Sequence, residues 1–274
     1  MEYTGIKALQ GAAALDRAAS LFDGWEETMI WAVLEGRMGQ LWVCAEEADP
    51  AACADAMPAA ACCQNGDFLF FTGDAATEQA LQLVQGVRTL LGESFGIATP
   101  QNEQWSQRII QVFGDRAKAG ERYAIRKEPG CFRREHLQQL AAVLPRTMQM
   151  LPIDAALYHR IMESNWARDF CSQFGSAEQF VEEGLGYVAL LDGEIVGGAS
   201  SYIRYNNGIE IQVETHPDHR RKGVATACSA RLILACMDRG LYPSWDAANR
   251  TSVHLAEKLG YREKGAYRVW YLNG

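Results

Sequence analysis

The sequence predicts an α/β (α+β) fold divided into two domains. Its 274 residues exceed the roughly 100 to 150 that one hydrophobic core usually serves. Helix-like and strand-like patterns alternate along the chain. In each half, two short apolar runs flank Asn65-Gly66 or Asp192-Gly193, and such dipeptides indicate β-hairpins. A hydrophobic fraction of 48% and a charged fraction of 22% are those of a packed globular protein.

The first half contains enough elements for one domain. We expect one helix over 12–34, a strand over 41–45 and a hairpin with strands at 59–63 and 68–72. Helices over 77–91 and 102–113 and a strand over 123–126 follow. Pro129-Gly130 is the predicted boundary, because proline and glycine interrupt regular structure. The predicted domains are therefore residues 1–130 and 131–274.

The second half repeats part of this order. The patterns predict a helix over 133–144, an extended segment over 148–151, helices over 155–162 and 177–183, and a hairpin over 187–191 and 194–201. No residue-level repeat is visible. The order of elements alone suggests two related halves, of which one retains chemistry.

Charge and composition exclude several functional classes. The net charge is -8, and residues 1–130 contain 18 acidic and 10 basic side chains, so a nucleic acid is not the expected partner. No apolar run is long enough to span a membrane, and the N-terminus lacks a signal-peptide pattern, so we expect a cytoplasmic protein. The eight cysteines include no CxxC pair, which favours buried free thiols over a zinc site or disulfides.

The most informative segment begins at a strand whose residues alternate over 209–214. A loop containing Arg220, Arg221, Lys222 and Gly223 follows it, and then an apolar helical run from Val224 to Gly240. The unpaired N–H groups of a helix start attract anions, and glycine permits close approach to a phosphate. A solvated turn before a helix is the alternative interpretation of this loop alone.

A second pattern follows at a fixed distance. We expect a strand over 243–247, a two-turn helix that Asn249 caps and Gly260 ends, and a strand over 267–272. Together the two patterns resemble the GNAT acetyltransferase superfamily. Arg220-x-x-Gly223-x-Ala225 fits its pyrophosphate loop, and Asn249 to Tyr261 fits its second signature.

The resemblance implies the fold, the cosubstrate and its site. Each domain would hold a central mixed, mostly antiparallel sheet flanked by helices, with a degenerate GNAT-like domain over 1–130 and the acetyltransferase domain over 131–274. Acetyl-CoA would be the cosubstrate. Its diphosphate, pantetheine arm and thioester would contact the following residues, mostly through the main chain: Val213, Thr215, Arg220, Arg221, Lys222, Gly223, Val224, Ala225, Thr226, Asn249 and Ser252.

Amine acetylation needs a base, because an alkylammonium of pKa about 10.4 is neutral only about once in 2,500 molecules at pH 7. Glu214 and Glu210 share the polar face of the 209–214 strand, and Glu214 is the first candidate. Both side chains could instead only solvate the strand. His216 and His219 are read as polar loop residues, so no metal is expected. Asp246 and Trp245 line the acceptor pocket or belong to the core.

One position departs from the superfamily. Its usual tyrosine acid falls at Ala256, and Tyr261, Tyr267 or Tyr271 would have to replace it unless the thiolate leaves unassisted. The sequence therefore predicts an N-acetyltransferase that moves an acetyl group from acetyl-CoA to a primary amine in a ternary complex. A non-catalytic acyl-CoA-binding or regulatory module is the alternative. The acceptor, a small-molecule or peptide amine, cannot be named, and the edge strands of such a fold permit a homodimer.

Overall fold

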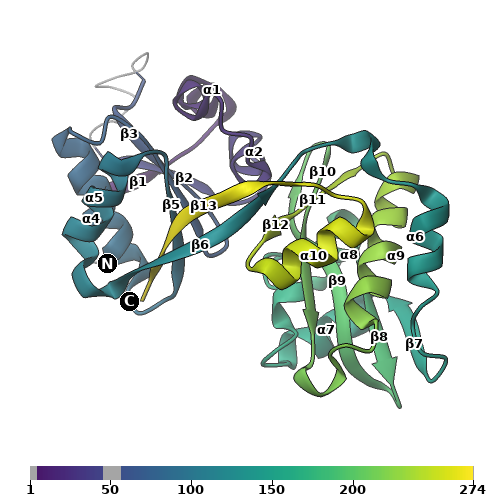
Figure 1. Ribbon diagram of the computed structural model, residues 1–274. Coiled ribbons are helices and arrows are strands. Elements are labelled where there is room, and N and C mark those ends of the chain that lie inside the picture. Colours follow the sequence, from purple (N-terminus) through teal and green to yellow (C-terminus); the bar gives the residue numbers. More distant parts are fainter. Residues whose placement is uncertain (1–4, 46–56, 274) are drawn as a thin grey trace. The chain divides into compact units, whose positions relative to one another are not determined.

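The computed structural model describes residues 5–45 and 57–273, which form two compact units (Figure 1). One unit comprises Met1–Arg122 with Ala266–Gly274, and the other comprises Tyr123–Gly265. The last strand, β13 (Glu263–Leu272), therefore begins in the second unit and ends in the first. The predicted domain boundary at residue 130 stays a prediction, because a division into compact units does not by itself locate the boundary between two domains in the sequence.

The first unit is a mixed sheet flanked by helices. Its strands lie in the order β1-β2-β3-β4-β5-β13-β6, and only β4 and β5 pair in parallel among the pairs that involve β1 to β5. Besides β13, these strands are β1 (Ile6–Leu9), β2 (Gln40–Cys44), β3 (Ala60–Asn65), β4 (Phe68–Gly73), β5 (Gly96–Pro100) and β6 (Ala117–Ile125). The helices are α1 (Ala12–Ala19), α2 (Thr28–Leu34), α4 (Glu78–Leu91) and α5 (Glu103–Phe113).

The second unit has a five-stranded sheet in the order β11-β10-β9-β8-β7. Its strands are β7 (Met148–Pro152), β8 (Gly186–Leu191), β9 (Glu194–Tyr205), β10 (Gly208–Thr215) and β11 (Tyr242–Ser244); the short β12 (Asp246–Ala247) pairs with Tyr123 and Ala124 of β6. The helices are α6 (Arg134–Ala141), α7 (Ala155–Glu163), α8 (Ala177–Glu183), α9 (Val224–Asp238) and α10 (Arg250–Leu259). The predicted fold class is confirmed in both units.

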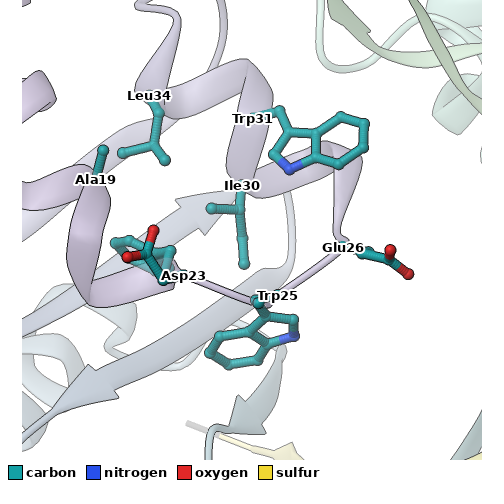
Figure 2. A pocket seen from close by; sticks show the side chains of 9 residues that line it. Ala19, Asp23, Trp25, Glu26, Ile30, Trp31 and Leu34 are labelled. Atoms are coloured by element: carbon teal, nitrogen blue, oxygen red, sulfur yellow. The ribbon is translucent and has the colours of Figure 1, made fainter.

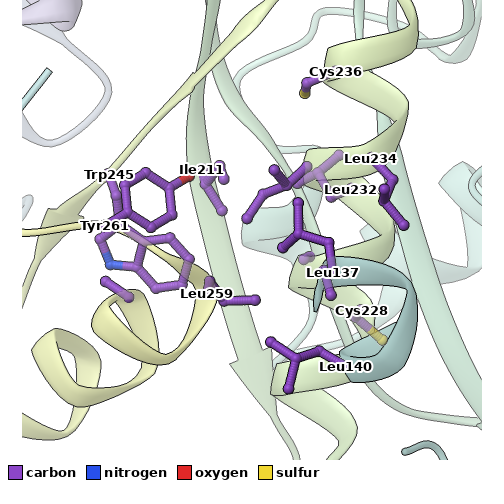
Figure 3. Close-up of a cluster of buried hydrophobic side chains, with 14 of the residues drawn as sticks. Leu137, Leu140, Ile211, Cys228, Leu232, Leu234, Cys236, Trp245, Leu259 and Tyr261 are labelled. Carbon is purple, nitrogen blue, oxygen red and sulfur yellow. The ribbon is translucent and has the colours of Figure 1, made fainter. Parts of the chain in front are cut away.

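Helix α9 is the centre of the second unit's core. Small side chains, such as Cys228, alternate with Leu232 and similar large ones, so almost every face of the helix can be buried. Leu140 of α6 and Leu259 of α10 belong to the same cluster, which continues onto the sheet (Figure 3). This packing fixes the N-terminus of α9 relative to β10, and the candidate site lies at that junction.

Both predicted hairpins are confirmed. Asn65 pairs with Phe68, and Leu191 pairs with Glu194, so each turn has two central residues. Asp192 and Gly193 have φ angles of 51° and 86°. Positive φ at both central positions is what a type I′ turn requires, and this turn matches the right-handed twist of the strands.

Two expectations about the elements were wrong, and two strands, β1 and β5, were missed. The single helix over 12–34 is interrupted, because Gly24, with φ 78°, lies in a turn between a 3₁₀ segment at Ser20–Phe22 and α2. The strands β1 and β5 are too short to show a clear period in the sequence. The strand over 243–247 is divided into β11 and β12, which pair with different neighbours.

The order of elements supports a duplication. Strand, two helices, three strands, helix, strand, helix, strand occurs from β1 to β6 and again from β7 to β13, if β11 and β12 count as one interrupted strand. No helix in the part of the chain that the structure describes is both long enough and apolar enough to cross a membrane. Of the eight cysteines, all but Cys53 are described, and these seven are free thiols, while Cys53 lies outside the described residues.

Candidate active site

Strands β10 and β11 part at one edge of the second sheet, where β11 is the last strand. They pair in parallel only from Gly208 to Glu210, opposite Tyr242 to Ser244. Beyond Glu210, β10 remains paired with β9, and the register shifts between Glu210 and Ile211, as at a β-bulge. Among the described residues no strand pairs with the other edge of β10 from Ile211 to Thr215. This leaves main-chain donors and acceptors that an extended ligand can use like a strand.

The loop after β10 ends in an open helix start. Gly223 precedes α9 with φ 83° and offers no side-chain cap, and Arg221 also has a positive φ of 63°. Within the described residues, the main-chain N–H groups from Arg221 to Thr226 donate to no main-chain carbonyl. Unsatisfied N–H groups together with the helix dipole form an anion site. The loop that the sequence predicts to bind an anion therefore presents free main-chain N–H groups.

Two cationic side chains of the loop donate hydrogen bonds to residues that precede them in the sequence. Arg220 donates from Nη2 to Glu214 Oε1 (3.2 Å) and from Nε to the carbonyl of Thr215 (3.2 Å). Lys222 Nζ donates to the carbonyl of Asp218 (3.0 Å). Val224 is 1% exposed, so it can reach a ligand only through its main chain.

Asn249 and Ser252 organise the start of α10. The Oδ1 atom of Asn249 accepts a hydrogen bond from the N–H of Ser252 (3.0 Å), which is an N-cap. The Ser252 hydroxyl accepts one from the Trp245 indole N–H (3.0 Å). Asn249 is exposed, and its amide N–H₂ group donates to no other described residue, so it can bind a ligand while the cap remains. Trp245 is 3% exposed and belongs to the core.

Glu210 lies where β10 and β11 part, and its side chain is only 3% exposed. Its register partner in β11 is Ser244, whose hydroxyl accepts a hydrogen bond from Lys127 Nζ (2.8 Å). Neighbouring side chains of paired strands point to the same face, so the Lys127 ammonium lies on the face that carries Glu210. Burial, assisted by nearby charges that include Glu210, raises the pKa of Tyr242. Lys127 and Ser244 could not be identified from the sequence, because no local pattern shows that residues 126–128 lie beside β11.

Glu214 has different surroundings. It lies at the phosphate-loop end of β10, with its side chain 40% exposed and paired with Arg220. It lies four positions along the extended strand from Glu210, a distance of roughly 13 Å. Val213 and Thr215 lie on the edge of β10 that has no second strand. The two candidate carboxylates therefore belong to opposite ends of the opening.

None of the four positions considered for the acid, Ala256, Tyr261, Tyr267 and Tyr271, places a free hydroxyl in the second unit. Ala256 is fully buried in the core. Tyr261 donates its hydroxyl hydrogen to the Pro243 carbonyl (2.7 Å), and burial raises its pKa well above the ordinary range. Tyr267 and Tyr271 belong to the first unit, where Tyr271 stacks on Phe95.

The comparisons with known proteins identify the family. A family model described as GNAT acetyltransferase matches residues 19–270. The chain belongs to the GNAT acetyltransferase family. The family supports acyltransferase activity in general terms, and the opening between β10 and β11 lies beside the loop that carries the family's first signature.

Relatives of this GNAT chain include proteins with and without solved structures. A GCN5-related N-acetyltransferase-like protein from Streptococcus suis 89/1591 is 41% identical, with a TM-score of 0.84 over 96% of this chain and 100% of that one. An uncharacterised N-acetyltransferase of Bacillus subtilis (strain 168), YdfB, is 27% identical over 172 residues, 62% of this chain and 63% of the relative. The match thus spans less than two thirds of that relative's length. A tandem GNAT protein from the clavulanic acid biosynthesis pathway is 11% identical with a TM-score of 0.52 over 98% of both chains, which shows the fold alone.

Proposed function

We propose that the second unit transfers an acetyl group from acetyl-CoA to a primary amine by direct attack. The observation that carries this proposal is the parting of β10 and β11 directly before an uncapped helix start. One end of the opening offers N–H groups to a diphosphate, and the other offers a buried carboxylate. A ligand with an anionic end, an extended amide-containing arm and a reactive end matches this arrangement.

The main chain would hold most of the coenzyme. The N–H groups from Arg221 to Thr226 would bind the diphosphate, and Arg220 would add positive charge. The free edge of β10 at Val213 and Thr215 would pair with the amides of the pantetheine arm. The Asn249 amide would donate to the arm from the side of α10.

The dimensions support Glu210 as the base. From Thr215 back to Glu210 the strand extends roughly 16 Å, so an arm anchored at the phosphate loop delivers its thioester toward Glu210. Glu214 lies at the anchored end and pairs with Arg220. We therefore assign proton removal to Glu210, directly or through a water, and anchoring of Arg220 to Glu214.

The chemistry is an ordinary acyl transfer. The carboxylate accepts a proton from the ammonium, and the freed nitrogen lone pair attacks the thioester carbonyl. A main-chain N–H beside the register shift at Ile211 would stabilise the oxyanion. The C–N bond forms, the nitrogen gives up its second proton to water, and the C–S bond breaks. The coenzyme leaves as a thiolate, which is tolerable for a thiol of pKa about 8.5.

Ala256 favours one other function, a module that binds acyl-CoA without turnover. Its buried methyl supplies no proton to a leaving group. Both functions require coenzyme binding, and they differ only in thiol release when an amine is present.

The test has a binding arm and a turnover arm. Calorimetry with acetyl-CoA should show saturable binding to the whole chain, and a panel of polyamines, aminoglycosides and peptide amines should reveal thiol release for at least one amine. Glu210→Gln should then lower kcat by about 10² to 10⁴-fold while the coenzyme Kd stays the same. Glu214→Gln, the matched control on the same strand, should mainly weaken coenzyme binding.

Each failure has a separate meaning. Absence of coenzyme binding overturns the proposal entirely. Binding with no thiol release across the panel replaces catalysis by the binding module. Normal turnover of Glu210→Gln removes the assigned base but leaves the coenzyme site.

A further inference from the structure

The first unit contains a pocket that the proposed chemistry does not use. It has a volume of about 370 Å³ and lies between α1 and α2, against the sheet (Figure 2). The chain segment between these helices and α2 itself supply most of its wall. The residues that line it are Ala19, Phe22, Asp23, Gly24, Trp25, Glu26, Ile30, Trp31 and Leu34.

The pocket joins aromatic faces to negative charge. Phe22 and Ile30 are 4% and 0% exposed, Trp25 and Trp31 are half-buried, and all four line the pocket. The remaining polar side chains, from Asp23 and Glu26, are carboxylates at the rim. No lysine or arginine is among the described residues that line it.

The wall is held in place by local contacts. Trp25 meets Phe70 of β4 edge to face at 5.7 Å and lies 6.3 Å from Phe22. The main-chain N–H of Trp25 donates to the Phe22 carbonyl (3.0 Å), and this hydrogen bond closes the turn that contains Gly24. The indole is therefore positioned before any ligand binds, which lowers the entropic cost of binding. Among the described residues, none forms a hydrogen bond or ion pair with the Asp23 carboxylate.

We propose that this pocket binds an organic cation: a quaternary or alkyl-substituted ammonium with a small hydrocarbon body. Indole faces attract cations more strongly than other aromatic rings, and a nearby carboxylate complements the charge without removing the apolar contact. A neutral apolar ligand would gain nothing from Asp23, and an anion would be repelled by the rim. The volume suits a small ligand of this class.

The sharpest probe is a pair of molecules of equal shape. Choline carries a trimethylammonium group, and 3,3-dimethylbutan-1-ol has the same outline with carbon in place of the charged nitrogen. Binding is followed on the whole chain through the indole N–H resonances, of which the seven tryptophans give at most seven. Trp25→Phe and Trp31→Phe variants assign the two signals of interest. We expect choline to shift both signals, with an affinity about tenfold or more above that of the neutral alcohol.

Two variants test the source of the discrimination. Asp23→Asn removes the rim charge and should reduce the choline affinity several-fold while leaving the alcohol unaffected. Asp16→Asn makes the same change on the exposed face of α1, outside the pocket, and should change neither. Trp25→Leu keeps an apolar wall without a π face and should abolish the preference for the cation.

Three outcomes would overturn the proposal. These are equal affinities for choline and the alcohol, shifts that do not saturate at either indole, and an Asp16→Asn variant that weakens choline as much as Asp23→Asn does. If Trp25→Leu does not fold, the comparison of the two exposed aspartates still decides. None of these measurements involves acetyl-CoA, so they neither rest on nor test the proposed transferase activity.

Discussion

The Gly223→Ala substitution tests the coenzyme site most directly. Gly223 has φ 83°, a conformation that costs an L-residue about 1 to 2 kcal/mol. A Cβ atom at this position would lie 3.3 Å from Val143 Cγ2, a contact that a small side-chain shift can relieve. The variant is therefore expected to fold, with the backbone at residue 223 relaxing toward negative φ.

That relaxation turns the adjacent peptide groups out of the anion cradle. Binding of the diphosphate must restore the positive φ, so the strain of about 1 to 2 kcal/mol appears in the binding free energy. This corresponds to a rise of about 5- to 30-fold in the Kd for acetyl-CoA. Calorimetry measures this change directly, and the same variant should lose about 2 to 4 °C in Tm per kcal/mol of strain that the folded state retains.

Gly240, at the other end of α9, provides the matched control. It has φ 66°, and a Cβ atom there would meet nothing within 4 Å. Gly240→Ala therefore introduces the same kind of backbone strain far from the cradle and should lower Tm without changing the coenzyme Kd. Wild-type affinity of Gly223→Ala, or an equal loss of affinity in Gly240→Ala, would refute the assignment of the diphosphate to this loop.

Three further changes have defined outcomes. Tyr261→Phe removes a buried hydrogen bond to the Pro243 carbonyl and should lower the free energy of unfolding by about 1 to 3 kcal/mol in urea titrations, with the coenzyme Kd unchanged. Arg220→Ala removes an exposed cation beside the phosphate loop and should raise that Kd about tenfold at low salt but less at high salt. Burial raises the pKa of Cys228 and Cys236 to about 12, so both thiols ionise at lower pH in the unfolded chain than in the folded one. Their contribution to the free energy of unfolding should therefore be complete below pH 9. Above pH 9 it should fall by roughly 1.4 kcal/mol per thiol for each pH unit.

The sequence predicted best where local chemistry decides the structure. The hairpin at Asp192-Gly193 follows from two residues that tolerate positive φ, and the N-cap at Asn249 follows from a side chain that reaches its own helix. The same holds for the open start of α9. Gly223 has no side chain to cap the helix, so its exposed N–H groups follow from sequence and geometry together.

The parts that escaped prediction depend on contacts between distant segments. Residues 243–247 alone do not predict the interruption between β11 and β12. It arises because β11 pairs with β10, whereas β12 pairs with β6. The position of Lys127 beside Ser244 depends on the same exchange of partners. Side-chain type and spacing identified both glutamates as candidates, but only the parting of the strands distinguishes their surroundings.

The two units share one order of elements but differ in whether the corresponding pair of parallel strands stays closed. In the first unit, β4 and β5 stay paired from Phe68 to Phe71, and the N–H of Gln101 continues the pairing onto the Phe71 carbonyl. The slot that β10 and β11 leave open is therefore closed between β4 and β5.

The segment that follows β4 is closed as well. Arg108 donates from Nε to the carbonyl of Ala75 (2.7 Å) and from Nη2 to that of Ala76 (3.1 Å), and Thr77 caps α4 by accepting from the N–H of Ala80 (3.2 Å). A capped helix presents fewer free N–H groups to a diphosphate than an uncapped one. Among the described residues of the first unit, an extended acyl-CoA thus finds neither an open strand edge between β4 and β5 nor an uncapped start of α4, so we expect no compensation there for the weaker coenzyme binding of Gly223→Ala.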